Sequence, residues 1–163
     1  MCDETLTAYH ESGHAVVGYA LGGKIDSMQL WGEADDYLPE RFGDCRVAWG
    51  RVDPNTDWQR QREIMTILAG PVAEMIYRGE KLHPATYGPW QHDWDTAMSI
   101  ASDVVRHPVK CTRLLEMVIL ELHQHLQKEP CWPAIAQLAD ELEAHEMLEA
   151  EQVADVLEFW LSR

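Results

Sequence analysis

The stretch TAYHESGHAVVGYALGG, residues 7–23, combines a helical pattern with the spacing of a metal site. Small and apolar residues fill most of it, and the glycine pair at its end is typical of a helix stop. It therefore predicts a helix over residues 7–21. On that helix His10 and His14 are four positions apart, so both imidazoles lie on one face about one turn apart. Glu11 projects from nearly the same side.

The spacing H-E-x-x-H supplies two zinc ligands and a base from five residues. Zinc needs a third protein ligand and keeps a fourth position for water, whose pKa it lowers towards neutrality. A carboxylate that is not itself a ligand takes the proton as this water attacks a carbonyl. His10 and His14 are thus candidate ligands and Glu11 is the candidate base. The competing interpretation is a solvent-facing helix turn without a metal.

The third ligand is not determined by this motif. No third histidine follows within residues 7–23, so the ligand must come from later in the chain. One candidate is Glu74, and the segment WQHDWDTA offers His92, Asp93 and Asp95. All of these residue types bind zinc, and physical chemistry alone leaves the choice open.

The rest of the chain predicts a mainly α fold with a small antiparallel β-sheet after the first helix. Residues 24–32 and 45–52 are short and rich in β-forming residues, so we expect two strands joined by an acidic loop through residues 33–44. Apolar stripes at helical spacing follow, and Pro71 is expected to kink or interrupt the first of them. We interpret residues 1–163 as a single domain. The expected later helices cover residues 58–79, 92–106, 111–127, 130–148 and 149–161.

The charge of the chain argues against nucleic-acid binding. It has 13 Lys and Arg against 28 Asp and Glu, a net charge of −15, which repels phosphate backbones. The imbalance is greatest in residues 129–162, which hold nine acidic residues and no Lys or Arg. This acidic stretch is either a solvated helix face or a docking face for a basic partner.

Other features predict a cytoplasmic protein. No run of 18 apolar residues codes for a membrane span, and the acidic N-terminus differs from a secretory signal. The cysteines form no C-x-x-C pair, so we expect free thiols in or near the core. These residues are Cys2, Cys45, Cys111 and Cys131.

Residues 7–22 resemble the active-site helix in the peptidase domain of FtsH-type ATP-dependent zinc proteases, whose usual form is H-E-A-G-H-A-V-V-G. Within the pentad, Ser12 replaces the family's alanine. The segment ILAGPVAEMIYRGE, residues 67–80, is similar to the family's L-G-G-R-A-A-E-E helix. GPWQHDWDTAMSIASDVVR, residues 88–106, resembles its G-A-x-N-D-L-x-x-A-T-x-I-A-R segment, and residues 132–157 resemble its C-terminal helices.

This resemblance implies a helical zincin-type peptidase domain that hydrolyses peptide bonds in flexible or unfolded polypeptides. In the family, an aspartate followed four residues later by alanine is the third zinc ligand, and Asp93 with Ala97 fits that frame. The resemblance therefore implies that His10, His14 and Asp93 hold Zn²⁺ and that Glu11 is the general base.

The resemblance also bears on partners. FtsH-type proteases carry a membrane anchor and an ATPase module before the peptidase domain, but this sequence has no G-x-x-x-x-G-K-[ST] phosphate loop. We therefore expect a stand-alone version that associates with further copies of itself, a separate ATPase or a full-length relative. The alternative function is a catalytically weak zinc-binding module that regulates or binds a partner, against which the intact Glu11 argues.

Three further residues have two interpretations each. Glu74 could support a ligand histidine, or it could pair with Arg78 one helical turn later. Trp31 and Trp49 are expected to pack in the core, and the alternative is that they line a cleft.

Overall fold

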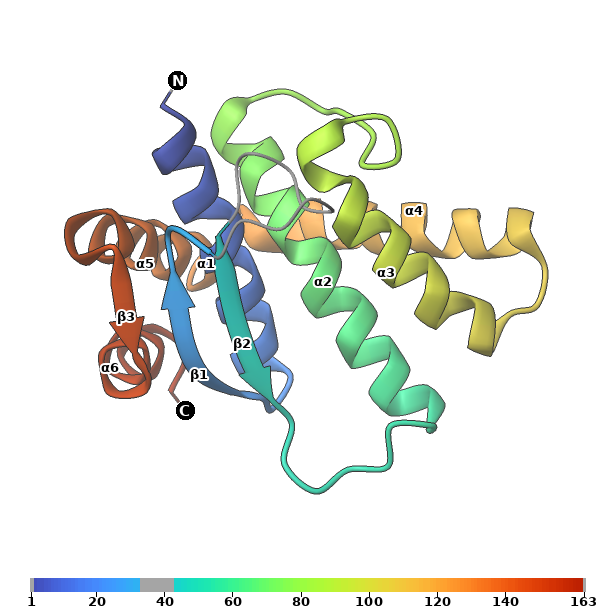
Figure 1. Cartoon of the computed structure of the whole chain (residues 1–163), viewed down its shortest axis with the longest axis horizontal. Coiled ribbons are helices and arrows are strands. Elements are labelled where there is room, and N and C mark those ends of the chain that lie inside the picture. The colour runs from blue at the N-terminus through green and yellow to red at the C-terminus, as the bar shows by residue number, and fades with distance from the viewer. Residues whose placement is uncertain (1, 33–42, 163) are drawn as a thin grey trace.

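The computed structural model describes residues 2–32 and 43–162 (Figure 1). This part of the chain is mainly helical and contains a three-stranded antiparallel sheet, which confirms the coarse prediction. Residues 33–42, most of the predicted acidic loop, lie outside the described part. The elements in chain order are α1 (Asp3–Ala20), β1 (Lys24–Gln29), β2 (Asp44–Ala48), α2 (Asp57–Arg78), α3 (Gly88–Val104), α4 (Pro108–Leu126), α5 (Cys131–His145), β3 (Met147–Glu149) and α6 (Ala150–Leu161).

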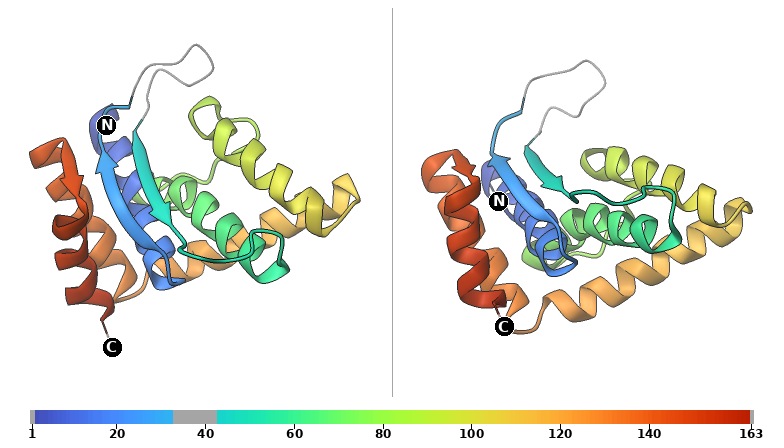
Figure 2. Two further views of the ribbon diagram at one scale, coloured as in Figure 1. Left: turned by 60° about the horizontal axis from the view of Figure 1, so that its bottom comes forward. Right: turned by 90° about the horizontal axis from the view of Figure 1, so that it is seen from below.

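Helix α1 lies at the centre of the fold. It packs against α2 and α5 and against the strands β1 and β2, so other elements surround it (Figures 1 and 2). Ala8, Ala15 and Val16 are fully buried. A helix enclosed in this way has apolar and small residues on most of its faces, as this one does. Gly22, with a φ of 102°, adopts the left-handed conformation just beyond its end.

Gly13 brings α1 and α2 into close contact. A Cβ atom at this position would meet the carbonyl oxygen of Ala69 and would lie 2.7 Å from Cβ of Ala73. Only glycine leaves room for this approach. That explains why glycine occupies this position, although in a helix interior it destabilises by about 1 kcal/mol relative to alanine. The contact holds the H-E-x-x-H turn of α1 against the middle of α2.

The sheet has the order β2-β1-β3, and β3 was not predicted. Met147 and Leu148 were expected to end a helix, but α5 stops at His145 because Glu146 takes a φ of 63°. The carbonyl of Glu146 accepts a hydrogen bond from the Leu30 amide at 2.8 Å. The strand that follows is only three residues long and is held by pairing with β1, so no local pattern indicates it.

Helix α2 continues through Pro71, so the predicted interruption does not occur there. Proline removes one backbone hydrogen bond, and the packing of α2 against α1, α3 and α4 stabilises the helix around it. Prolines also explain why two helices begin earlier than predicted. Pro89 and Pro108 lie in the first turns of α3 and α4, where the missing N–H has no helical partner to lose.

The tryptophan prediction is wrong for Trp31, whose side chain is 51% exposed. Trp49 is partly buried and lines a cavity, as the alternative interpretation proposed. All four cysteines are free, but only Cys111 is buried and Cys2 is exposed. Within the described residues, none of the helices is both long enough and apolar enough to cross a membrane.

Candidate metal centre and catalytic site

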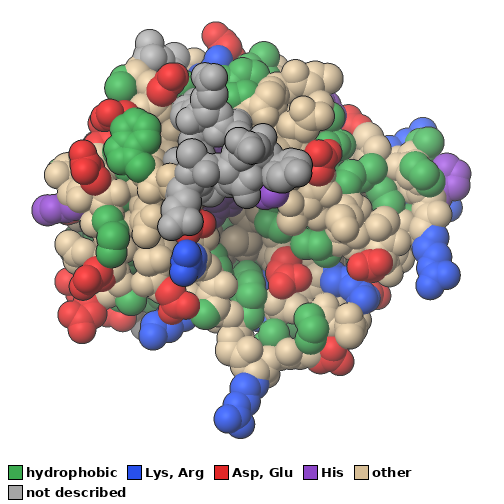
Figure 3. Space-filling view, viewed as in Figure 1, with side chains coloured by type: hydrophobic (Ala, Val, Ile, Leu, Met, Phe, Trp, Pro, Cys, Tyr) green, Lys and Arg blue, Asp and Glu red, His purple; other side chains and the backbone are tan. Residues whose placement is uncertain are grey.

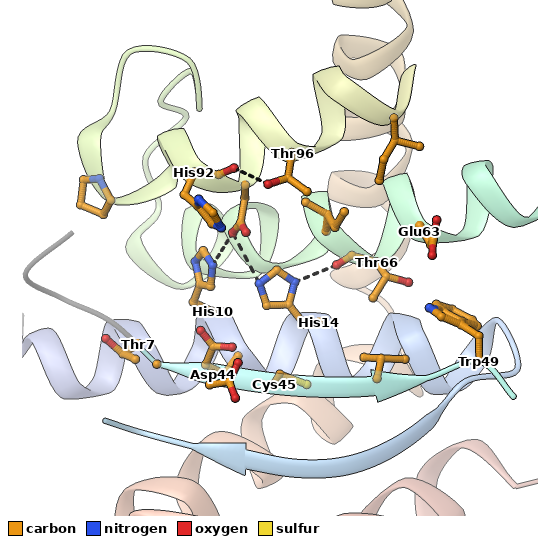
Figure 4. A pocket seen from close by; sticks show the side chains of 17 residues that line it. Thr7, His10, His14, Asp44, Cys45, Trp49, Glu63, Thr66, His92 and Thr96 are labelled. Atoms are coloured by element: carbon orange, nitrogen blue, oxygen red, sulfur yellow. Dashed lines mark hydrogen bonds and ion pairs between the residues drawn. The ribbon is translucent and has the colours of Figure 1, made fainter. Parts of the chain in front are cut away.

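Three helices and one strand surround a cavity of about 620 Å³ that contains the predicted site residues (Figure 4). His10, Glu11 and His14 line it from α1, and Asp93 lines it from α3. The other walls come from α2 and from β2, one of the two outer strands of the sheet. Figure 3 shows this face of the molecule hollowed near its centre, with histidine side chains at the hollow.

Two imidazoles and one carboxylate converge in this cavity. Nε2 of His10 lies 2.7 Å from Oδ2 of Asp93, and Nε2 of His14 lies 3.5 Å from the same oxygen. The two imidazole rings stand nearly perpendicular, with their centroids 4.8 Å apart. Nitrogen atoms of both histidines and a carboxylate oxygen of Glu11 all lie within 4.8 Å of one another.

The second nitrogen of each histidine faces an acceptor. Nδ1 of His14 donates to the carbonyl oxygen of Thr66 at 2.8 Å, so the lone pair of neutral His14 is on Nε2, inside the cavity. Nδ1 of His10 lies 3.5 Å from Oε1 of Glu74. That separation is too long for a well-formed hydrogen bond, and among the described residues this buried Nδ1 has no hydrogen-bond partner.

Glu74 faces the residues of both interpretations, His10 and Arg78. Its side chain is fully buried, and Oε2 accepts a hydrogen bond of 2.7 Å from Nε1 of Trp90. The same oxygen lies 3.7 Å from a guanidinium nitrogen of Arg78, the partner expected one turn later. Oε1 faces His10, so Glu74 joins this histidine to α3.

The four candidates for the third ligand have different positions. The Asp93 carboxylate faces Nε2 of both histidines, whereas Glu74 faces Nδ1 of His10. His92 also lines the cavity but is exposed. Asp95 is exposed and does not line the cavity.

Gly70 on α2 makes room for the pair of imidazoles. A Cβ atom here would lie 2.8 Å from Nε2 of His10 and still closer to Nε2 and Cε1 of His14. The two Nε2 atoms that face Asp93 therefore also lie in the space beside Gly70, where any side chain on residue 70 would displace them. Two imidazole nitrogens and one carboxylate oxygen form a donor set that suits divalent transition metals. These residues could hold a metal ion.

Several buried side chains in the cavity have pKa values shifted from their ordinary values. Burial alone would lower the pKa of His10, but its hydrogen bond to Asp93 and the nearby Glu74 raise this pKa to about 10. Burial likewise opposes the charged form of His14, and Asp93 outweighs this effect and raises its pKa. For Asp93, the two histidines outweigh burial and hold the pKa well below its usual range. Burial raises the pKa of Glu11 despite the two histidines. Without a metal, the site is thus an ion pair between Asp93 and His10.

Three contributors to the site were missed by sequence reasoning. Thr66 acts through its backbone carbonyl, which no side-chain pattern reveals. Trp90 lay in a segment expected to be a loop. Gly70 did have a signal, because an isolated glycine within a helical stripe often marks close packing or function.

No protein-family model matches this chain, and no curated protein matches it. What the site can do therefore follows from its residues and their geometry.

Proposed function

We propose that this protein is a zinc-dependent metallopeptidase that hydrolyses flexible or unfolded polypeptides, similar to the FtsH-type peptidase domains that its sequence resembles. The convergence of His10 Nε2, His14 Nε2 and Asp93 Oδ2 at Gly70 carries this proposal. These three residues would hold Zn²⁺. When bound, zinc polarises a substrate carbonyl and makes a water molecule more acidic.

The protein contributes orientation at the two histidines. The carbonyl of Thr66 accepts a hydrogen bond from the Nδ1–H of His14 and thereby keeps Nε2 turned into the cavity. The carboxylate of Glu74 faces Nδ1 of His10 at 3.5 Å, farther than a well-formed hydrogen bond. Partners of this kind fix the orientation of a ligand imidazole and increase its basicity. Binding a metal requires that the proton between His10 and Asp93 leaves.

Glu11 is the proposed general base. Its carboxylate is buried beside both histidines, and burial raises its pKa, so it accepts a proton more readily near neutral pH. It would take a proton from the attacking water and then transfer it to the leaving amine nitrogen. Residues of β2 line the cavity, and among the described strands β2 pairs only with β1, so an extended peptide could pair with this strand. A folded substrate would first need unfolding, which a separate ATPase partner would provide.

The test combines metal content with hydrolysis by a base-deficient variant. We expect one zinc ion per chain and cleavage of an unstructured casein-like protein. Glu11→Gln should keep the zinc and lower kcat by a factor of about 10² or more, the usual contribution of a general base. Glu151→Gln, an exposed change on α6, serves as the matched control and should cleave at the wild-type rate.

The alternative is a catalytically weak zinc-binding module that regulates or binds a partner. Zinc bound at one ion per chain, together with no cleavage of any unstructured substrate, would favour it. A chain that binds no zinc would contradict both proposals.

A further inference from the structure

The cavity continues beyond the histidines to a second end. Figure 4 shows Glu63 and Trp49 together at that end, past His14 and Thr66. Glu63 lies on α2 one turn before Thr66 and Ile67, and all three line the cavity. From α3, Ile100 lines it two turns after Asp93. The wall of this end is thus apolar and aromatic, with one carboxylate.

Apart from its histidines, the charged side chains of the cavity lining are all acidic among the described residues. Among the described residues its lining includes four carboxylates and neither Lys nor Arg. Glu11 and Asp93 belong to the metal centre, and Asp44 forms an ion pair with Arg46 at 3.1 Å. Glu63 forms no ion pair with any described residue. A cation is therefore the complement that this end of the cavity lacks.

Arg62, the residue next to Glu63 in the chain, does not supply that cation. The Arg62 guanidinium carbon lies 4.9 Å from the centroid of the Trp49 ring, and Arg62 does not line the cavity. Its nitrogens donate to the Leu21 carbonyl at 3.0 Å and to the Gln59 side chain. Arg62 is thus committed to the end of α1, where it supports the position of Trp49.

We propose that this end of the cavity is a specificity site for a lysine or arginine side chain of the substrate. The inference rests on the proposed peptidase function and names its substrate preference. The aliphatic stem would pack against Trp49, Ile67 and Ile100, while the cationic head would reach Glu63. Lysine and arginine commonly pack their aliphatic stem on apolar surface while the charged head contacts polar groups. A charge-assisted hydrogen bond is stronger than a neutral one.

The test uses series of peptides that differ at a single position, and the varied position is shifted along the peptide from one series to the next. That position carries lysine, arginine, norleucine, glutamine or glutamate, because norleucine keeps an aliphatic stem and lacks the charge. We measure kcat/KM with the zinc-loaded wild type and equilibrium binding to zinc-loaded Glu11→Gln by fluorescence anisotropy. At one position near the cleaved bond, lysine and arginine should exceed norleucine about tenfold in both measurements.

Two substitutions at Glu63 assign the preference to this residue. Glu63→Gln should bring the ratio of lysine to norleucine close to one, and Glu63→Lys should favour the glutamate peptide. Glu158→Gln is the control, because it removes the same charge from an exposed position on α6. The net charge of −15 attracts cationic peptides regardless of Glu63. An equal loss of the lysine preference in Glu63→Gln and Glu158→Gln would therefore show that this overall attraction causes the preference, which would overturn the proposal.

The two measurements separate this proposal from the peptidase proposal. Cleavage without a preference for lysine or arginine overturns the specificity site and leaves the peptidase intact. A binding preference that Glu63→Gln abolishes, without cleavage by the wild type, keeps the site and refutes the peptidase. Equal binding of lysine and norleucine peptides at every position also overturns the specificity site.

Discussion

At the scale of single residues, Gly70 has more influence on the candidate metal centre than its lack of a side chain suggests. It lies on α2, where its missing Cβ leaves the space that Nε2 of His10 and Nε2 of His14 occupy. The histidines come from a different helix, so this space exists only once α1 and α2 have packed. The residue acts by shape and supplies no ligand.

Gly70→Ala should therefore weaken zinc binding without unfolding the protein. Alanine favours a helix by about 1 kcal/mol over glycine, which offsets part of the steric cost. The displaced imidazoles should lose zinc affinity by a factor of about 10–100, as when groups that orient metal ligands are changed. Competition with a chromophoric chelator measures this affinity.

Ser12→Ala is the matched control for this experiment. Ser12 is fully buried on α1 between the two histidines, and its hydroxyl has no hydrogen-bond partner among the described residues. Alanine here should leave zinc affinity unchanged. Wild-type zinc affinity in Gly70→Ala would show that the imidazoles do not depend on this space.

At the scale of elements, the contact between α1 and α2 positions the site. Gly13 lies against the backbone of α2 at Ala69, one residue before Gly70. The two glycines thus mark one place where the helices touch, and both candidate ligand histidines lie within one turn of Gly13. A change in the helix separation would move these ligands away from Asp93.

Gly13→Ala should destabilise the fold. The new Cβ would meet the carbonyl oxygen of Ala69, and backbone atoms cannot yield as a side-chain end can. Overpacking costs about 1–3 kcal/mol, and the helix preference of alanine returns about 1 kcal/mol. We expect a net loss of up to about 2 kcal/mol in the free energy of unfolding, measured with urea.

Gly18→Ala provides the comparison within the same helix. Its Cβ would meet only side-chain methyl groups of Val47 and Thr66, at 3.2–3.3 Å. These ends can shift by a few tenths of an ångström, so the free energy of unfolding should stay within about 1 kcal/mol of the wild type. Equal losses in the two variants would argue against a special role for the contact at Gly13.

At the scale of the whole molecule, the metal-free site links α1 to α3 through a charged pair. His10 in the folded chain keeps its proton up to a pKa of about 10, compared with 6.5 for an ordinary imidazole. The folded state therefore binds this proton more tightly than the unfolded state. The resulting stability is fully present below pH 6.5 and is lost as the pH rises towards 10.

We expect the melting temperature of the metal-free protein to fall between pH 6.5 and pH 10. In Asp93→Asn the neutral amide cannot stabilise the imidazolium, so the fall should be smaller. Zinc should act in the opposite sense, because it competes with the proton for Nε2, and its stabilising effect should grow with pH. Differential scanning calorimetry with and without zinc measures both trends. An equal pH dependence in wild type and Asp93→Asn would contradict the pairing.

The sequence alone determined the helical character of the chain, the central helix and the local part of the site. These features depend on residues close together in the chain: the apolar periodicity of residues 7–21 and the four-residue spacing of His10 and His14. The strands β1 and β2 were also predictable from their composition. Periodicity and spacing express backbone geometry directly, so one sequence suffices to detect them.

Only the tertiary structure decided which distant groups meet these residues. It brought Asp93 to both imidazoles, aligned the Thr66 carbonyl with His14, and paired β3 with β1. It also kept α2 helical through Pro71 and placed Trp49 beside a cavity. Such contacts join segments tens of residues apart, and packing energy selects them over local preference. Local patterns do not contain that information.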